Sequence, residues 1–148
     1  MDTISDASIR EQTTERLEKA MGSFGTAALA RMEEQLPWFR RLPADQRSWI
    51  GLVAQAGIAA FVEWFKSAEK TRPAIAGEVF GTAPLELMRS IKLHHTIDII
   101  RVIIDVVESR LDELAAPGGE TQLREAILRY TREVAFGAAQ VYARAAET

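Results

Sequence analysis

Two adjacent histidines, His94 and His95, are the residues whose type and spacing point most directly to chemistry. Asp98 follows His94 by four residues, so on a helix an imidazole and a carboxylate would share one face and could hold a metal ion between them. Neighbouring helical residues point about 100° apart, so at most one of the two histidines faces a core. Three interpretations stay open: a solvated histidine beside a hydrogen-bonded one, a histidine at a ligand pocket or dimer seam, and a haem ligand.

Aromatic residues and one arginine offer a second kind of site, an apolar pocket with a polar edge. Trp49 and Trp64 stand near the two ends of a long apolar stretch, where they either fill a core or line a pocket. Arg101 interrupts a β-branched run, and its guanidinium either pairs with a neighbouring carboxylate or anchors a carboxylate or phosphate group of a ligand. The sequence therefore predicts a ligand site edged by Trp49, Trp64, His95 and Arg101, if these side chains are not purely structural.

Catalytic signatures are missing from the sequence. It contains no phosphate-binding glycine loop, no nucleophile elbow and no His-Glu-x-x-His zinc motif. It also has no cysteine, which excludes disulfides, thiolate zinc sites and a cysteine nucleophile. A metal site built on the two histidines would need carboxylates from other helices. We therefore expect no enzymatic activity and no resident metal or cofactor.

Composition is typical of one mildly acidic globular domain spanning 1–148, with roughly the first eight residues frayed. Of the 148 residues, 47% are hydrophobic and 26% charged, and the net charge is −3. That balance argues against direct contact with DNA, whose binding proteins carry a basic face. The N-terminus lacks the features of a signal peptide, and the apolar run Ile97–Val107 is far shorter than the roughly 20 residues of a membrane helix. We expect a cytoplasmic protein without membrane contact.

Apolar residues recur three or four positions apart along most of the chain, and the five prolines fall between these periodic stretches. The helices expected from this pattern span residues about 6–36, 44–66, 85–115 and 120–146. The first is either continuous or divided near Ser23, and the third breaks near Lys92; a short helix is expected around 74–80. The small residues in the middle of the second helix would let neighbouring helices approach closely. The predicted fold class is all-α, a multi-helix bundle.

The stretch from Ile97 to Val107 is nearly all β-branched, so propensity alone would favour a strand. Its charges favour a helix instead. Asp98, Arg101 and Asp105 are spaced three and four apart, which places them on one helical face but would scatter them over both faces of a strand. We predict a helix that is buried over most of its circumference.

The final helix carries an apolar stripe with near-heptad spacing that includes Tyr130, Val134 and Val141. At 1.5 Å per residue this helix would be about 40 Å long, longer than a compact domain of this size needs. It reaches Thr148 without a C-terminal glycine or proline, so we expect it to continue elsewhere. The stripe is either intramolecular core or a self-association seam. On the second interpretation the protein is a homodimer with Tyr130, Val134 and Val141 at its interface.

Four segments in this order resemble one known family. They are Met32–Phe39 (MEEQLPWF), Gly51–Trp64 (GLVAQAGIAAFVEW), Thr96–Val102 (TIDIIRV) and Tyr130–Phe136 (YTREVAF). Together they resemble the N-terminal domain of actinobacterial PucR/CdaR-type transcriptional regulators, most closely those associated with fatty-acid synthesis. Such domains are also similar to the N-terminal domains of RsbR-type stress regulators, which implies a globin-like helical fold without haem.

The resemblance implies a regulator whose N-terminal module senses or dimerises and whose C-terminal helix-turn-helix, absent from these residues, binds DNA. His95 departs from the pattern, because relatives often carry Gln before the Thr-Ile-Asp run. The family supplies no ligand-contacting residues to transfer. We therefore expect a non-enzymatic regulatory and dimerisation domain that relays a signal to a DNA-binding domain. The alternative is a sensor that binds an acyl or carboxylate metabolite as a small-molecule effector in an apolar pocket.

Overall fold

The computed structural model describes residues 3–67 and 91–147, and helices form nearly all of these residues. Within these residues the elements are α1 (Thr3–Gln35), α2 (Pro37–Arg40), α3 (Ala44–Lys66), α6 (Leu93–Ser109), α7 (Leu111–Leu114) and α8 (Glu120–Glu147). The described part of the chain contains no strand. The prediction of an all-α, multi-helix bundle is therefore confirmed.

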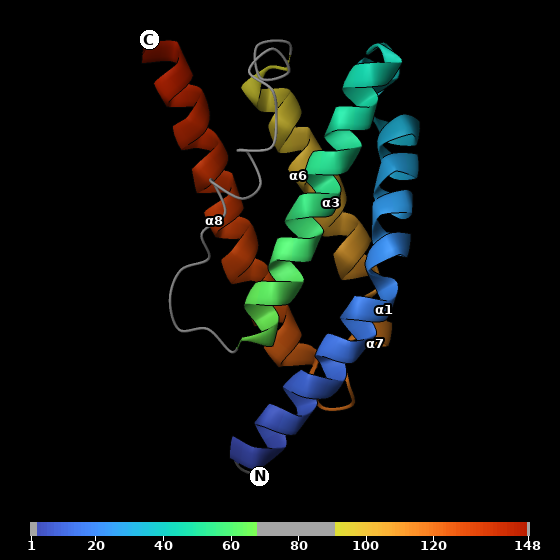
Figure 1. Cartoon of the computed structure of the whole chain (residues 1–148), viewed down its shortest axis with the longest axis vertical. Coiled ribbons are helices and arrows are strands. Elements are labelled where there is room, and N and C mark those ends of the chain that lie inside the picture. The colour runs from blue at the N-terminus through green and yellow to red at the C-terminus, as the bar shows by residue number, and fades with distance from the viewer. Residues whose placement is uncertain (1–2, 68–90, 148) are drawn as a thin grey trace.

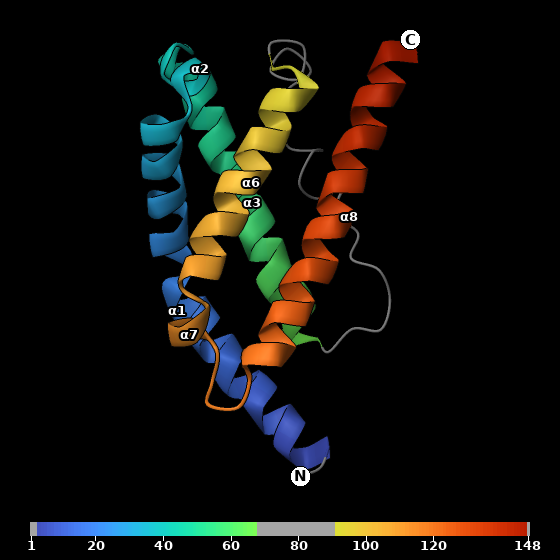
Figure 2. The ribbon, with the colours of Figure 1, turned by 180° about the vertical axis from the view of Figure 1, so that it is seen from behind.

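The four long helices run lengthwise through the molecule (Figure 1). α1 and α8 run in one direction and α3 and α6 in the other, so that the N-terminus and the C-terminus lie at opposite ends. α1 packs against both α3 and α6, and α8 packs against α6. The view from behind shows α8 diverging from its neighbours toward its C-terminal end (Figure 2).

Helix boundaries agree closely with the sequence pattern for α3 and α8. Gly22 and Gly25 do not divide the first helix, since α1 is continuous from Thr3 to Gln35. The break expected near Lys92 is the N-cap of α6. The helix expected around 74–80, and the start of the run expected at 85, lie outside the described residues.

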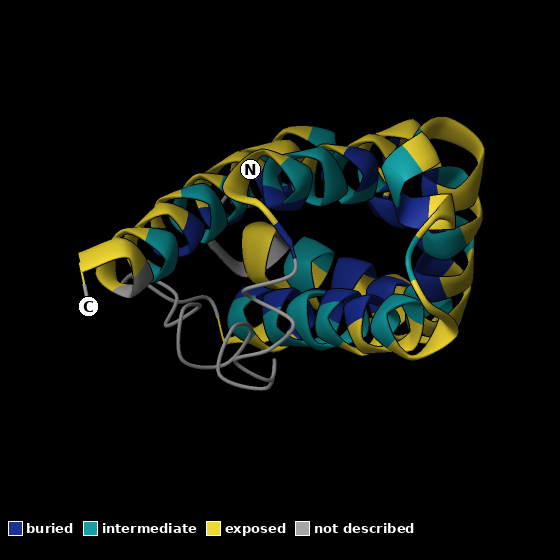
Figure 3. Ribbon diagram, turned by 90° about the horizontal axis from the view of Figure 1, so that it is seen from above, coloured by how far each residue is buried: buried dark blue, intermediate teal, exposed yellow. Residues whose placement is uncertain are grey.

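Buried side chains gather on the inner faces of the helices, and exposed residues cover the outside (Figure 3). One end of the core is aromatic: Phe61 and Phe65 of α3 stack with ring centroids 6.0 Å apart. The guanidinium of Arg10 lies 4.9 Å from the centre of the Phe65 ring and donates a hydrogen bond to the Phe65 carbonyl oxygen. The first turns of α1 are thereby attached to the last turns of α3.

The loop between α7 and α8 is held against α1. Thr13, which is fully buried, accepts a hydrogen bond on Oγ1 from the backbone N–H of Ala116 at 3.0 Å, and Arg16 donates to the Ala115 carbonyl at 2.9 Å. Gly118 has a φ of +83°, a left-handed conformation that glycine adopts at little cost. The next residue, Gly119, has no side chain that could collide with α1, so the loop can approach α1 closely.

Adding a methyl group at that glycine, Gly119→Ala, is expected to destabilise the protein by about 1–3 kcal/mol. The new Cβ would lie 2.6 Å from Ile9 Cγ2 and 3.1 Å from the Ala116 carbonyl oxygen, so α1 or the loop must move. The matched control is Gly22→Ala in α1, where a Cβ would meet nothing within 4 Å. There alanine should raise the free energy of unfolding by up to about 1 kcal/mol through helix propensity. Urea denaturation measures both; equal effects would contradict the close packing at Gly119.

Candidate functional site

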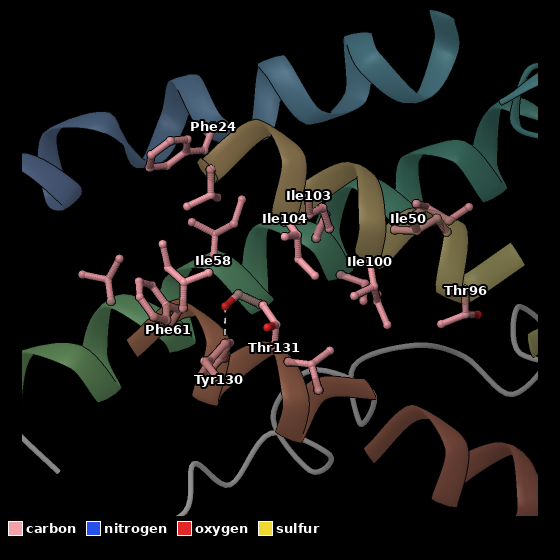
Figure 4. Close-up of a pocket in the computed structure, with 18 of the residues that line it drawn as sticks. Phe24, Ile50, Ile58, Phe61, Thr96, Ile100, Ile103, Ile104, Tyr130 and Thr131 are labelled. Carbon is pink, nitrogen blue, oxygen red and sulfur yellow. Dashed lines mark hydrogen bonds between the residues drawn. The ribbon is translucent and has the colours of Figure 1, made fainter. Parts of the chain in front are cut away.

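An apolar cavity of about 150 Å³ lies between α3, α6 and α8 (Figure 4). α1 closes its inner side with Leu17 and Phe24, both almost completely buried. The cavity is partly open to solvent, and apolar side chains form nearly all of its described lining. The cavity is therefore the strongest candidate for a binding site in the described part of the chain.

The wall contributed by α6 consists of β-branched side chains three and four residues apart. They are Ile99, Ile100, Ile103, Ile104 and Val107. This spacing places them on one helical face, while the acidic and basic residues of the same stretch face outward. Arg101, Asp105 and Glu108 are exposed. The charged residues therefore mark the solvent face of α6, and the isoleucines mark the face that lines the cavity. The helix predicted for this stretch is confirmed.

Small side chains in the middle of α3 leave room for the cavity. Ala54 and Gly57 lie at the middle of the cavity, with larger side chains such as Ile50 and Phe61 toward its two ends. The close approach expected for these small residues occurs on the α1 side, where a Cβ on Gly51 would lie 3.2 Å from Leu29. Toward α6 the same helix leaves a cavity instead. Small side chains thus serve packing on one face of α3 and create space on the other.

Tyr130 of α8 closes one end of the cavity against α3. Its ring meets the Phe61 ring edge to face with centroids 5.1 Å apart, and its hydroxyl donates a hydrogen bond of 3.1 Å to the Gly57 carbonyl. Trp64 packs on the same tyrosine at 5.7 Å. This aromatic junction joins α3 to α8 in the region where the two helices come together.

A pair of hydroxyl groups occupies the opposite end. Tyr142 of α8 donates a hydrogen bond of 2.8 Å to the Ile91 carbonyl, and its oxygen lies 2.7 Å from Thr96 Oγ1 of α6. Because the single Tyr142 proton is committed to Ile91, the Thr96 hydroxyl must donate to Tyr142. The C-terminal half of α8 is thereby tied to the start of α6 through two polar contacts at the edge of the cavity.

None of the cavity-lining residues that the structure describes carries a charge. The fourth hydroxyl in the wall, that of Thr131, donates to the Leu128 carbonyl within its own helix at 3.2 Å. All four hydroxyl protons therefore have protein acceptors. The cavity offers an apolar volume with hydrogen-bond acceptors at its edges.

The residues predicted to edge a ligand pocket lie elsewhere. Trp49 is 39% exposed on α3, Arg101 is exposed on α6, Trp64 packs behind Tyr130, and His95 stacks on Trp38. None of the four is among the described residues that line the cavity. These four side chains therefore do not form the described wall of this cavity.

The residues predicted for a dimer interface differ in their environments in the structure. Tyr130 and Val134 line the cavity, and Tyr130 is buried, so their side chains are turned toward the interior of this chain. Val141 is half-buried. Sequence reasoning did not single out Thr96 and Tyr142; the isoleucine spacing in α6 was the available signal for the cavity wall.

The two histidines belong to a separate cluster at the junction of α2 and α6. The Trp38 indole N–H donates to Asp98 Oδ2 at 3.1 Å, and the indole stacks on the His95 imidazole with centroids 4.1 Å apart. His94 packs edge-on against His95 at 4.2 Å. In the described residues no group of three metal-ligating side chains comes together. The cluster attaches the short helix α2 to α6.

Acidification is expected to lower the free energy of unfolding through His95. Burial, and secondarily the neighbouring His94, lower the pKa of His95 below its ordinary value of 6.5. Protonation of His95 therefore costs more free energy in the folded protein than in the unfolded chain. The corresponding part of the free energy of unfolding is fully present above pH 6.5 and is lost as the pH falls through the lowered pKa. Denaturation at pH 7.5 and 5.5 should show a smaller loss in His95→Gln than in the wild type. The control His94→Gln should retain most of the loss, because burial of His95 remains; an unchanged loss in His95→Gln would contradict the assignment.

α3 has the length and apolar composition of a helix that could cross a membrane, alone among the helices that the structure describes. The central helix of a water-soluble bundle meets the same two criteria, and in this chain α3 supplies Ile58, Val62 and Phe65 to the core. The expectation of no membrane contact stays a prediction.

No protein-family model matches the chain. The chain is 36% identical to uncharacterized protein Rv2242 of Mycobacterium tuberculosis and to uncharacterized protein Mb2266 of Mycobacterium bovis. Each alignment is 148 residues long and covers 99% of the chain. It spans about a third of the length of these curated relatives (34%). The similarity therefore covers nearly all of this chain but one part of considerably longer mycobacterial proteins.

Proposed function

We propose that this chain is a ligand-sensing regulatory domain, in which a small apolar molecule bound between α3, α6 and α8 alters the position of α8. The cavity is the observation that carries the proposal. Ligand sites are typically concave and mostly apolar, with a few placed polar groups, and this cavity has that character. The regulatory context rests on the resemblance to PucR/CdaR-type regulators, and a sensor that forms one part of a longer protein agrees with the length of the mycobacterial relatives.

The location of α8 supports a route from the ligand to the rest of such a protein. α8 contributes Tyr130, Val134 and Tyr142 to the cavity wall, so a bound molecule lies against this helix. Its C-terminal half is attached to α6 by the Thr96–Tyr142–Ile91 hydrogen bonds. A ligand that rearranges these bonds would therefore shift the end of α8 that lies farthest from the N-terminus (Figure 1).

Titration with small apolar molecules tests the sensing function. Binding to the folded state raises the melting temperature in proportion to the logarithm of ligand concentration above Kd. We expect single-ring compounds to raise the melting temperature and to shift the methyl NMR signals of the α6 isoleucines. If no such compound changes either signal at millimolar concentration, the sensing proposal fails.

A second candidate function is dimerisation through the outer face of α8. Leu128 and Phe136, two turns apart on this helix, are 57% and 59% exposed. Large apolar side chains exposed near one another are typical of interaction surfaces. Sedimentation of the wild type and of Phe136→Asp tests this function: a wild-type dimer that the substitution converts to a monomer supports it, and a wild-type monomer at tens of micromolar rejects it.

A further inference from the structure

We infer, on the basis of the proposed sensing function, that the cavity selects an uncharged ligand, and that this ligand is roughly the size of one substituted benzene ring and donates a hydrogen bond to Thr96. The inferred ligand differs from the acyl or carboxylate metabolite of the alternative sensor function that the sequence suggested. Three properties of the cavity support the inference: its charge, its hydrogen-bonding groups and its volume.

A carboxylate inside the cavity would find no compensating partner among the described residues. The described lining residues include neither arginine, lysine nor histidine, and Arg101, Arg129 and Arg132, which adjoin lining residues in the sequence, are exposed. The four hydroxyl protons of the wall already have protein acceptors. Burial of an ionised carboxylate without a partner is strongly unfavourable. The described lining therefore disfavours an anionic group in the interior of the cavity.

A hydrogen-bond donor on the ligand, by contrast, has an acceptor available. Thr96 Oγ1 donates its proton to Tyr142, and its oxygen keeps lone pairs that accept no hydrogen bond from the described residues. Thr96 lies at one end of the cavity (Figure 4), and Tyr142, whose hydroxyl oxygen is 2.7 Å from Thr96 Oγ1, also lines it. A ligand hydroxyl or N–H placed at this end would extend the chain of hydrogen bonds from the ligand through Thr96 and Tyr142 to Ile91.

The volume sets the size of the ligand. Cavities of about 150 Å³ lined by leucine, isoleucine and phenylalanine remain dry and bind benzene. The present cavity has the same volume, about 150 Å³, and a similar lining. A single ring with one short substituent matches this volume.

Three probes of nearly equal size separate these properties: benzyl alcohol, ethylbenzene and benzoate, titrated into the 148-residue chain at pH 7.5 and followed by methyl NMR. Benzyl alcohol adds a donor to the apolar shape of ethylbenzene, and benzoate adds a charge. A net hydrogen bond contributes modestly, so benzyl alcohol should bind about three- to tenfold more tightly than ethylbenzene. Benzoate should bind at least tenfold more weakly than either.

Two variants assign the preference to Thr96. Thr96→Val should abolish the preference for benzyl alcohol while ethylbenzene still binds, and Thr96→Ser, which keeps the hydroxyl, should retain it. Thr26→Val on the exposed face of α1 is the control, and it should change neither affinity. Circular dichroism and the melting temperature establish that each variant is folded.

The outcomes distinguish the inference from the function on which it rests. Benzoate binding as tightly as benzyl alcohol, or an unchanged preference in Thr96→Val, overturns the inference but leaves the cavity a binding site. Failure of all three probes to bind at millimolar concentration overturns both.

Discussion

Filling the cavity by Ile100→Trp is expected to weaken the binding of ethylbenzene and benzyl alcohol more than tenfold without unfolding the protein. Ile100 belongs to the α6 wall and points into the space between α6 and α8 (Figure 4). The larger ring occupies volume that the ligand would otherwise take. Because that volume is already empty, the indole should fit with little of the strain that overpacking causes in a filled core.

Leu52→Trp is the matched control for this experiment. Leu52 is 60% exposed on α3, so the same change in side-chain size falls outside the cavity. Its ligand affinities should equal those of the wild type. NMR titration measures the affinities and thermal denaturation the stability. Unchanged affinity in a folded Ile100→Trp protein would show that the probes bind elsewhere and would remove the cavity as the basis of the proposed function.

The helices could be predicted from the sequence because their determinants are local. Pro43 and Asp45 lie at the start of α3, as expected for a first helical turn. In α6 the spacing of Asp98, Arg101 and Asp105 outweighed a strong preference for strand and correctly identified a helix. Such patterns depend on residues three and four apart, and these are neighbours wherever the helix lies.

The cavity could not be predicted, because it depends on the distance between helices rather than on a pattern within one. Ala54 and Gly57 are compatible with close packing and with a cavity equally, and the positions of α6 and α8 relative to α3 decide between them. For the same reason the sequence left open whether Tyr130, on the apolar stripe of α8, belongs to a dimer seam or to the core. In the structure its hydroxyl donates a hydrogen bond to the Gly57 carbonyl within the same chain. Bulky aromatic residues drew attention to Trp49, although an exposed position on α3 gives it no access to the cavity.

Truncation of the aromatic junction by Phe61→Ala is expected to lower the free energy of unfolding by about 3–5 kcal/mol. The Phe61 side chain is 8% exposed and meets three rings, those of Trp64, Phe65 and Tyr130. Its loss removes apolar contacts and leaves a void adjoining the existing cavity, so neighbouring side chains cannot easily collapse into it. For a domain of this size, such a change corresponds to a fall in melting temperature of roughly 10 °C or more.

Leu52→Ala provides the comparison for this loss, since the Leu52 side chain on α3 is 60% exposed. There truncation to alanine should change the free energy of unfolding by less than about 0.5 kcal/mol, as is usual for surface substitutions. Urea denaturation of the two variants measures the difference. The junction joins α3 to α8 where they converge, so Phe61→Ala should also loosen the end of the cavity and admit larger rings. A Phe61→Ala protein as stable as Leu52→Ala would mean that α3 and α8 are held together elsewhere, and that the cavity is not closed at this end by the aromatic rings.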